Sequence, residues 1–285
     1  MSCNSSYKFL YKRNNGGISL ACENEFSKNY WRIKKVMRYF NLFKNISNWW
    51  VHFQIKIGAF RNDSVSLATR NGIRFEVPTI LIHAFKEIFM EECYTHGAPL
   101  KIKDGMNIVD VGANVGVFTM FAAMRFPNAN IFSYEPIDAN FRQLQKNASL
   151  NASINIQCFN KAIYSHSGEI VLKLAENDFS TTASLIGDSG GMREIKVACV
   201  GIKEIFDENK IESCDFLKMD CEGAEYDALF SCPLEYLDRI KRMAIEIHSG
   251  TKSEYNGDAL RNYLEKHGFV TFETSKALGM LFAWK

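Results

Sequence analysis

Residues 107–119 read Asn-Ile-Val-Asp-Val-Gly-Ala-Asn-Val-Gly-Val-Phe-Thr, and residues 133–136 read Ser-Tyr-Glu-Pro. The apolar start of the first run predicts a buried parallel strand, and Gly112 permits a sharp turn without a Cβ clash. A helix that starts near Asn114 would present unpaired amides to an anionic group, and Gly116 would let a ligand or strand approach closely. The run therefore predicts a strand, a glycine turn and a helix at a ligand-binding edge.

The next predicted strand, 129–134, ends in Glu135, which lies 23 residues after Gly112. An acidic side chain about 20 residues beyond such a turn accepts hydrogen bonds from ribose hydroxyls. A dinucleotide fingerprint needs a glycine where Asn114 stands, because a pyrophosphate presses on the backbone there. S-adenosylmethionine has a ribose and an amino-acid carboxylate but no pyrophosphate, so the pattern favours it over NAD. A glycine turn that binds nothing is the alternative.

Strand-like and helical stretches alternate beyond residue 100, which predicts an α/β fold with a parallel sheet. We predict strands at 108–111, 129–135, 155–162, 169–174, 195–200, 216–220, 243–248, 269–273 and 277–284, and helices at 115–125, 138–149, 201–208, 223–231 and 258–266. The last two strands are expected to close the C-terminal edge as an antiparallel pair. The polar stretch 176–192 predicts a long loop, which is a candidate substrate lid.

Before the core, residues 64–77 alternate in polarity around Asn71-Gly72, a strong β-hairpin signal. Residues 80–94 predict a helix, and residues 30–57 predict one or two amphipathic helices with basic residues beside an aromatic face. We expect three segments: a basic, aromatic-rich helical extension (1–60), a hairpin and helix leading into the core (61–100), and the catalytic domain (101–285).

Charge is unevenly placed along the chain. Residues 1–60 hold ten Lys and Arg against two Glu, a net charge of +8, so the remainder carries −6 of the total +2. The extension is expected to dock on the catalytic domain, and the alternative is peripheral membrane contact through residues 30–57. The small total charge argues against a general nucleic-acid binder.

The bulk composition is that of a globular protein, with 285 residues, 47% hydrophobic and 23% charged. No apolar stretch approaches the roughly 18 residues that span a bilayer, and no secretion signal is present, so we expect a cytoplasmic protein. Eight scattered cysteines form no Cys-x-x-Cys pair, which indicates free thiols rather than a zinc or redox site.

Two further strand ends carry chemistry. Residues 216–225 read Phe-Leu-Lys-Met-Asp-Cys-Glu-Gly-Ala-Glu, and residues 244–248 read Ala-Ile-Glu-Ile-His, with the acid and the imidazole on one face of a strand. Methyl transfer to a hydroxyl needs positioned reactants and a proton acceptor. We predict His248 as the general base, with Glu246 or Glu222 orienting it or binding acceptor hydroxyls.

The remaining polar groups of these strand ends have less definite roles. Asp220 is expected near the ammonium or sulfonium end of the cofactor, and Glu225 is either a helix-start charge or a substrate contact. Asp220, Glu246 and His248 could also hold a divalent metal, but no spacing demands one, and we assign none. The other histidines receive no role: His52, His83, His96, His166 and His267.

Over about residues 64–250 the chain resembles the FkbM-type S-adenosylmethionine-dependent methyltransferases. The matching pieces are Glu87-Ile-Phe89 with Tyr94, Val109–Gly116 with Phe118-Thr119, Tyr134-Glu-Pro136, Asn140, Asn147, Asn151, Lys161-Ala162, Leu217–Glu225 and Glu246-x-His248. Cys221 and Ile202-Lys203 depart from the family pattern. We attribute Cys221 to packing, whereas Ile202-Lys203 leaves open where the helix near residue 202 starts. The first 60 residues match no family pattern.

This resemblance implies a Rossmann-like, seven-stranded, mostly parallel sheet with helices on both faces, S-adenosylmethionine as methyl donor, and O-methylation of a sugar, glycolipid or polyketide-type hydroxyl. It also implies these cofactor contacts: Asp110, Gly112, Asn114, Gly116, Glu135 and Asp220, with Lys161 and Ala162 near the adenine. The alternatives are an N-methyltransferase, or a membrane-associated partner protein that binds the cofactor without turnover.

Overall fold

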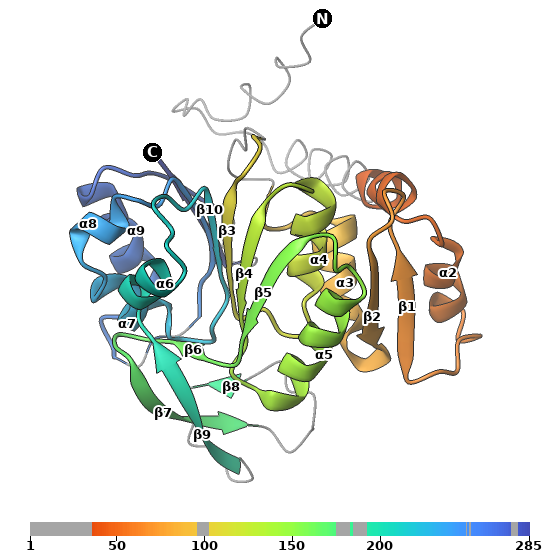
Figure 1. The fold of residues 1–285 in the computed structure, drawn as a ribbon, viewed down its shortest axis with the longest axis horizontal. Helices are drawn as coiled ribbons and strands as arrows, with labels where there is room; N and C mark the ends of the chain where they lie inside the picture. Colours follow the sequence, from red (N-terminus) through yellow and green to blue (C-terminus); the bar gives the residue numbers. More distant parts are fainter. Residues whose placement is uncertain are drawn as a thin grey trace, which may run out of the picture.

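The computed structural model describes residues 36–95, 103–174, 183–184, 193–248, 250, 252–274 and 279–285 (Figure 1). Its centre is a seven-stranded sheet. Across the sheet the strands run β12 (Val270–Glu273), β13 (Met280–Trp284), β11 (Arg242–Glu246), β10 (Phe216–Met219), β3 (Asn107–Val111), β4 (Asn130–Tyr134) and β5 (Asn155–Phe159). The neighbours β11, β10, β3, β4 and β5 pair in parallel, and β13 is antiparallel to β11 and β12. The predicted mostly parallel sheet with an antiparallel C-terminal edge is confirmed.

Two hydrophobic clusters cover the two faces of this sheet, because alternate strand residues point to opposite sides. On one face, Ile108 and Phe216 pack with α4 (Val117–Arg125) and with residues from the N-terminal part of the chain. On the other face, Val109 and Leu217 pack with α6 (Ile202–Glu208), α7 (Glu225–Phe230) and α9 (Gly257–Lys266). Helices therefore lie on both faces, as Figure 1 shows.

The predicted helices form within a few residues of their expected bounds. Helix α5 (Asp138–Ser149) matches its prediction at both ends, and α6 begins at the buried Ile202 despite the family departure there. The short α8 (Leu234–Leu237) was not predicted. Within the described residues no helix has the length and apolar character needed to cross a membrane.

A second sheet of four strands was not predicted. The order is β6 (Ala162–Ile163), β9 (Arg193–Val200), β7 (Gly168–Leu174) and β8 (Ala183–Ser184). Strands β7 and β9 pair antiparallel along seven residue pairs, so they leave the main sheet that the sequence pattern assigned them to. The predicted single strand 155–162 is also wrong, because these residues divide between β5 of the main sheet and β6 of the second sheet. Within the predicted lid 176–192, residues 183 and 184 form β8, and the other residues lie outside the described part of the chain.

The N-terminal elements pack on the face that holds α4. Residues 36–45 are helical, α2 spans Trp50–Lys56, and the predicted hairpin forms from β1 (Ser64–Ala68) and β2 (Arg74–Pro78). The predicted helix at 80–94 is a 3₁₀ turn η1 (Thr79–Leu81), α3 (Ile82–Phe85) and a π-helical turn η2 (Lys86–Met90). Residues 30–35 and 96–102 are outside the description, and the three segment boundaries stay a prediction.

Two buried asparagines of the α5 region hold the hairpin against the core. Asn147 accepts a hydrogen bond from the Glu76 amide at 2.8 Å and donates to the Glu76 carbonyl at 2.9 Å. Asn151 accepts a hydrogen bond from the Arg74 amide at 3.0 Å and donates to the Arg74 carbonyl at 2.7 Å. Both side chains therefore satisfy backbone groups on the open edge of β2, which would otherwise lack partners.

The glycine at the end of β3 gives a stability prediction. A Cβ at Gly112 would lie 1.7 Å from the Asp220 carbonyl oxygen, whereas a Cβ at Gly72 meets no atom within 4 Å, and both residues have positive φ. Gly72→Ala should cost about 1 to 2 kcal/mol from backbone strain alone. Gly112→Ala should cost at least about 2 kcal/mol more. Urea unfolding of both variants measures the difference, and equal losses would contradict the close contact.

Candidate active site

Four parallel strands end at the same edge of the sheet, so the residues at their carboxyl ends lie in a row. The row contains Glu135 after β4, Gly112 after β3, Asp220 after β10 and Glu246 as the last residue of β11. The strand order reverses between β3 and β10. From β3 the chain adds β4 and β5 on one side, and β10 and β11 lie on the other side. Ligands of open α/β sheets bind at such a switch point, so the row is where a ligand is expected.

A buried lysine holds the glycine turn in the row. Lys218 of β10 donates to the carbonyls of Val111 at 3.1 Å and Gly112 at 2.6 Å. Its ammonium also lies 3.2 Å from Asp110, whose other oxygen accepts from Thr119 at 2.7 Å. Burial alone would lower the pKa of Lys218, but the charges of the neighbouring aspartates raise it above its usual value. Asp110 is buried and lines neither of the two pockets described below, so its role as a cofactor contact stays a prediction.

The turn itself differs from its prediction in two ways. Helix α4 begins at Val117, not near Asn114, and the amides of Gly112, Ala113 and Asn114 donate to protein oxygens. At Gly116 the close neighbour is α5, because a Cβ there would lie 2.7 Å from Leu144 Cδ1. The glycines thus serve contacts within the protein, and no amide of residues 112–114 is left for an anion.

Glu135 is buried and already accepts three donors. Its oxygens lie 2.8 Å from the Asn114 amide, 2.9 Å from the Ile137 amide and 3.4 Å from Asn140 Nδ2. Burial raises the pKa of Glu135 to about 7, although these hydrogen bonds act in the opposite direction. A carboxylate offers about four lone-pair positions, so capacity for a ribose hydroxyl remains.

A pocket beside Glu135, here called the Glu135 pocket, contains most of the predicted cofactor residues. It is lined by Gly112, Asn114, Glu135, Lys161, Ala162 and Asp220, together with Val111, Tyr134, Pro136, Ile137, Asn140, Ile163, Ile170, Leu172, Cys221, Glu222 and Ala224. Ile170 and Leu172 belong to β7 and were missed, because the strand was assigned to the main sheet. The apolar lining fits an adenine ring, and the polar lining fits a ribose.

A second pocket, here called the Glu246 pocket, adjoins the first. Both are lined by Gly112, Asn114, Asp220 and Glu222, which form the junction between them. The other lining residues are Leu81, His83, Ala84, Glu87, Ile88, Tyr94, Ala113, Val115, Val117, Phe118, Lys218 and Glu246. The segment from Leu81 to Tyr94 therefore forms a wall of this pocket, which no local pattern predicted.

Two of the four non-glycine residues with positive φ among the described residues lie at the junction. Asn114 has φ +51° and Glu222 has φ +53°, both in the left-handed region. This region is tolerated by asparagine but costs other side chains energy, and it occurs often at functional sites. Burial, opposed by His248 and reinforced by Asp220, raises the pKa of Glu222 to about 7.

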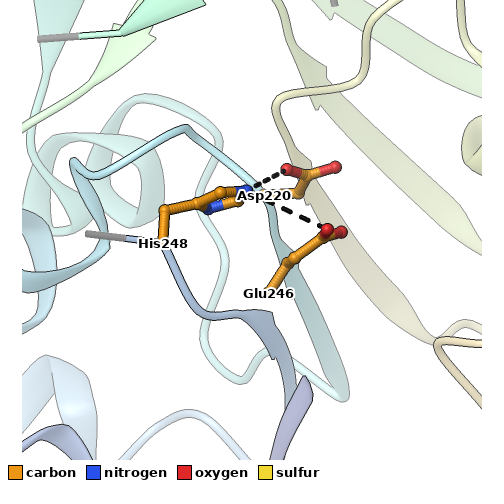
Figure 2. Close-up of side chains that lie close together, drawn as sticks. All are labelled: Asp220, Glu246 and His248. Carbon is orange, nitrogen blue, oxygen red and sulfur yellow. Dashed lines mark ion pairs between the residues drawn. The ribbon is translucent and has the colours of Figure 1, made fainter. Parts of the chain in front are cut away.

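His248 lies two residues beyond the end of β11, not on the strand as predicted, yet it still meets the acidic row (Figure 2). Its Nε2 lies 3.8 Å from Asp220 Oδ1, 3.7 Å from Glu222 Oε2 and 3.9 Å from Glu246 Oε1. Its Nδ1 contacts Glu225 Oε1 at 2.8 Å. Burial alone would lower the pKa of His248, but the hydrogen bond and charge of Glu225 and the charge of Glu222 raise it to about 9.

Two residues near the cluster have roles that the sequence did not assign. Glu225 is fully buried and accepts from the amides of Cys221 and Gly223 at 3.1 and 2.9 Å, so it fixes both the loop and His248. The Tyr94 hydroxyl lies 3.0 Å from both Asp220 and Glu246. Tyr94 belongs to the matched family pieces, but its partners are more than 120 residues away in the chain.

Comparison with known proteins agrees with this geometry. The family model for the methyltransferase FkbM domain matches residues 110–271, more than half of the chain. The chain therefore belongs to the FkbM methyltransferase family, and S-adenosylmethionine is its methyl donor.

Individual relatives are distant. A protein named methyltransferase 1 from Beauveria bassiana is 27% identical over 226 residues, which cover 73% of this chain and 87% of the relative. The 31-O-demethyl-FK506 methyltransferase FkbM from Streptomyces tacrolimicus is 26% identical over 58% of this chain and 73% of its own length. Among solved structures, TYW2 of M. jannaschii in complex with AdoMet is 14% identical with a TM-score of 0.38, covering 79% of this chain and 84% of that one.

We expect Glu135 to bind the cofactor ribose as a carboxylate. S-adenosylhomocysteine should then bind most tightly above pH 7, where Glu135 is ionised, and more weakly as the pH falls below its pKa of about 7. Glu135→Gln should weaken binding about 10- to 100-fold at pH 8 and remove the pH dependence. Calorimetry between pH 6 and 8 measures both, with Glu169→Gln on the exposed side of β7 as control. Unchanged affinity in Glu135→Gln would remove the ribose role.

Proposed function

We propose that this chain is an O-methyltransferase whose acceptor is a hydroxyl of a sugar, glycolipid or polyketide-type molecule. The junction of the two pockets at Gly112, Asn114, Asp220 and Glu222 is the observation that carries the proposal. The adenosyl group occupies the Glu135 pocket, with its sulfonium end toward Asp220. The acceptor enters the Glu246 pocket, and the methyl group crosses the junction.

The reaction is an in-line displacement at the methyl carbon. The acceptor oxygen forms a C–O bond while the S–C bond breaks, and the sulfonium becomes the neutral thioether of S-adenosylhomocysteine. The hydroxyl proton must pass to a base. The protein therefore has to align oxygen, carbon and sulfur and to supply a proton acceptor.

The acidic lining of the Glu246 pocket supports a hydroxylated, uncharged acceptor. Glu87, Glu222 and Glu246 line it, and each carboxyl group offers oxygens that accept hydrogen bonds from hydroxyls. An anionic acceptor would be repelled. A neutral amine needs no proton acceptor before attack, so the carboxylates and the imidazole at the junction disfavour the N-methyltransferase alternative. The same groups disfavour a non-catalytic partner protein.

The role of His248 as general base stays a prediction. Glu225 orients its ring, and Nε2 faces the acidic row. A pKa of about 9, however, leaves the imidazole protonated at neutral pH in the ligand-free site. If His248 is the base, kcat/KM should rise about tenfold per pH unit up to about pH 9. A profile that is flat between pH 7 and 9 would remove this role.

Product analysis tests the proposed reaction. With S-adenosylmethionine and a panel of hydroxylated acceptors, mass spectrometry should find one methyl group on oxygen. Asp220→Asn should lower kcat/KM at least about 100-fold, because Asp220 lies at the junction where reacting groups are aligned. Asp238→Asn, on the exposed surface, serves as the matched control. Transfer to amines with none to any hydroxyl would overturn the proposal.

We also propose peripheral membrane contact through the described part of residues 30–57. Phe40, Trp50 and Ile57 are 57%, 51% and 76% exposed, and the exposed Lys44 and Lys56 lie on the same two helical segments. Aromatic side chains beside lysines suit the interface of an anionic membrane. Such contact would bring the site to a glycolipid acceptor.

The membrane proposal predicts a loss of vesicle binding. Combined Phe40→Ser and Trp50→Ser should reduce co-sedimentation with phosphatidylserine vesicles at least about tenfold, since two aromatic rings no longer enter the interface. Combined Val270→Ser and Phe272→Ser, two exposed apolar residues of β12, is the control. If both double variants bind like the unaltered chain, this surface does not contact membranes.

A further inference from the structure

We infer that Asp220, Glu246 and His248 bind one divalent cation at the junction of the two pockets. One donor atom from each of the three residues lies within 4.8 Å of the other two. Figure 2 shows the imidazole facing both carboxylates. Two carboxylates and one imidazole suit Mg²⁺, Mn²⁺ or a related first-row metal ion.

The imidazole is held as metal-binding imidazoles are held. The carboxylate of Glu225 is fully buried and accepts a hydrogen bond from His248 Nδ1. The amides of Cys221 and Gly223 hold that carboxylate in place. The hydrogen bond keeps a proton on Nδ1, so the ion would displace the proton of Nε2 and take up the Nε2 lone pair, which faces the acidic row. A carboxylate behind the distal nitrogen orients a histidine ligand and strengthens it.

The distances fit a shared cation better than direct hydrogen bonds. Nε2 lies 3.8 Å from Asp220 Oδ1 and 3.9 Å from Glu246 Oε1, beyond hydrogen-bond range. Two ligands that are each about 2.1 to 2.3 Å from a metal lie roughly 3 to 4 Å apart. The spacing is therefore that of ligands around an ion.

In Asp220 and in Glu246, one carboxylate oxygen contacts Tyr94 and the other faces the proposed ion. Asp220 Oδ2 and Glu246 Oε2 lie 3.0 Å from the Tyr94 hydroxyl, while Oδ1 and Oε1 face His248. Tyr94 is buried and thereby orients both carboxylates toward one point. Its hydroxyl carries a single proton and can donate to only one of them at a time. The Lys218 ammonium lies 3.7 Å from Asp220 but is shared with Asp110, so a cation can offset the remaining repulsion between the carboxylates.

The cation's role rests on the proposed function, whereas its binding does not. Three protein ligands leave positions for acceptor oxygens at the edge of the Glu246 pocket. A coordinated hydroxyl would have a lowered pKa. Its proton would pass to Glu222, which lines both pockets, and its oxygen would form the C–O bond as the S–C bond of the sulfonium breaks. In this arrangement His248 is a ligand and not the proton acceptor. Neighbouring hydroxyls of a saccharide would occupy two positions together.

Manganese titration of the full chain tests the site without activity. After EDTA treatment and dialysis, electron paramagnetic resonance of free Mn²⁺ should show one bound ion per chain, displaced by Mg²⁺. Glu246→Gln keeps the side-chain shape and should weaken binding at least about tenfold, and His248→Ala more. Tyr94→Phe should weaken it less, because it removes only an orienting contact. Glu235→Gln, an exposed carboxylate on α8, is the matched control and should bind like the unaltered chain.

The outcomes separate this inference from the proposed function. If the chain binds S-adenosylhomocysteine but shows no saturable Mn²⁺ binding, the metal inference is overturned and the methyltransferase proposal stands. Equal Mn²⁺ binding by Glu246→Gln, His248→Ala and the unaltered chain overturns the inference as well. If Mn²⁺ binds at this cluster but no hydroxyl is methylated with or without it, the proposed function fails and the metal site remains.

Discussion

The rest of the site depends on the hydrogen bonds and ion pairs of one buried group, the ammonium of Lys218. It donates to the carbonyls of Val111, the last residue of β3, and of Gly112 in the turn, while Asp110 and Asp220 supply the opposite charge. A charge this deeply buried is tolerated only when it is paired and hydrogen-bonded, and removal of one partner costs about 3 to 5 kcal/mol. Lys218 therefore fixes the turn at Gly112 and the carboxylate of Asp220 relative to each other.

From that fixed point the sheet distributes the chemistry along its edge. The parallel register places Glu135 on one side of Gly112, and Asp220 and Glu246 on the other. In our proposal the cofactor's ribose lies at the end of β4 and its reactive end at the end of β10, on either side of β3, and the histidine cluster lies beyond β10. Residues of β7 and of the segment 81–94 complete the two pockets, so a segment before the core and a strand of the second sheet line the places where ligands are expected.

Prediction from sequence succeeded where the signal was local. The hairpin at Asn71-Gly72, the helix α5, the order of strands and helices in the core and the acidic strand ends follow from periodicity and turn chemistry. It failed for β7 and β9, whose alternation fits any sheet and does not say which one. Lys218 left a usable signal, a lysine inside the apolar strand Phe216–Met219, whereas nothing near Tyr94 in the chain points to its carboxylate partners.

The amino-acid sequence by itself determined the family, the methyl donor, the parallel sheet and the candidate residues at its edge, because strand periodicity, glycine turns and acidic strand ends are properties of neighbouring residues. Only the tertiary structure decided that Glu225 orients His248, that Tyr94 joins Asp220 to Glu246, and that Gly116 lies against Leu144 of α5. These contacts join residues far apart in the chain, and packing of whole elements sets their distances. No local pattern encodes such distances.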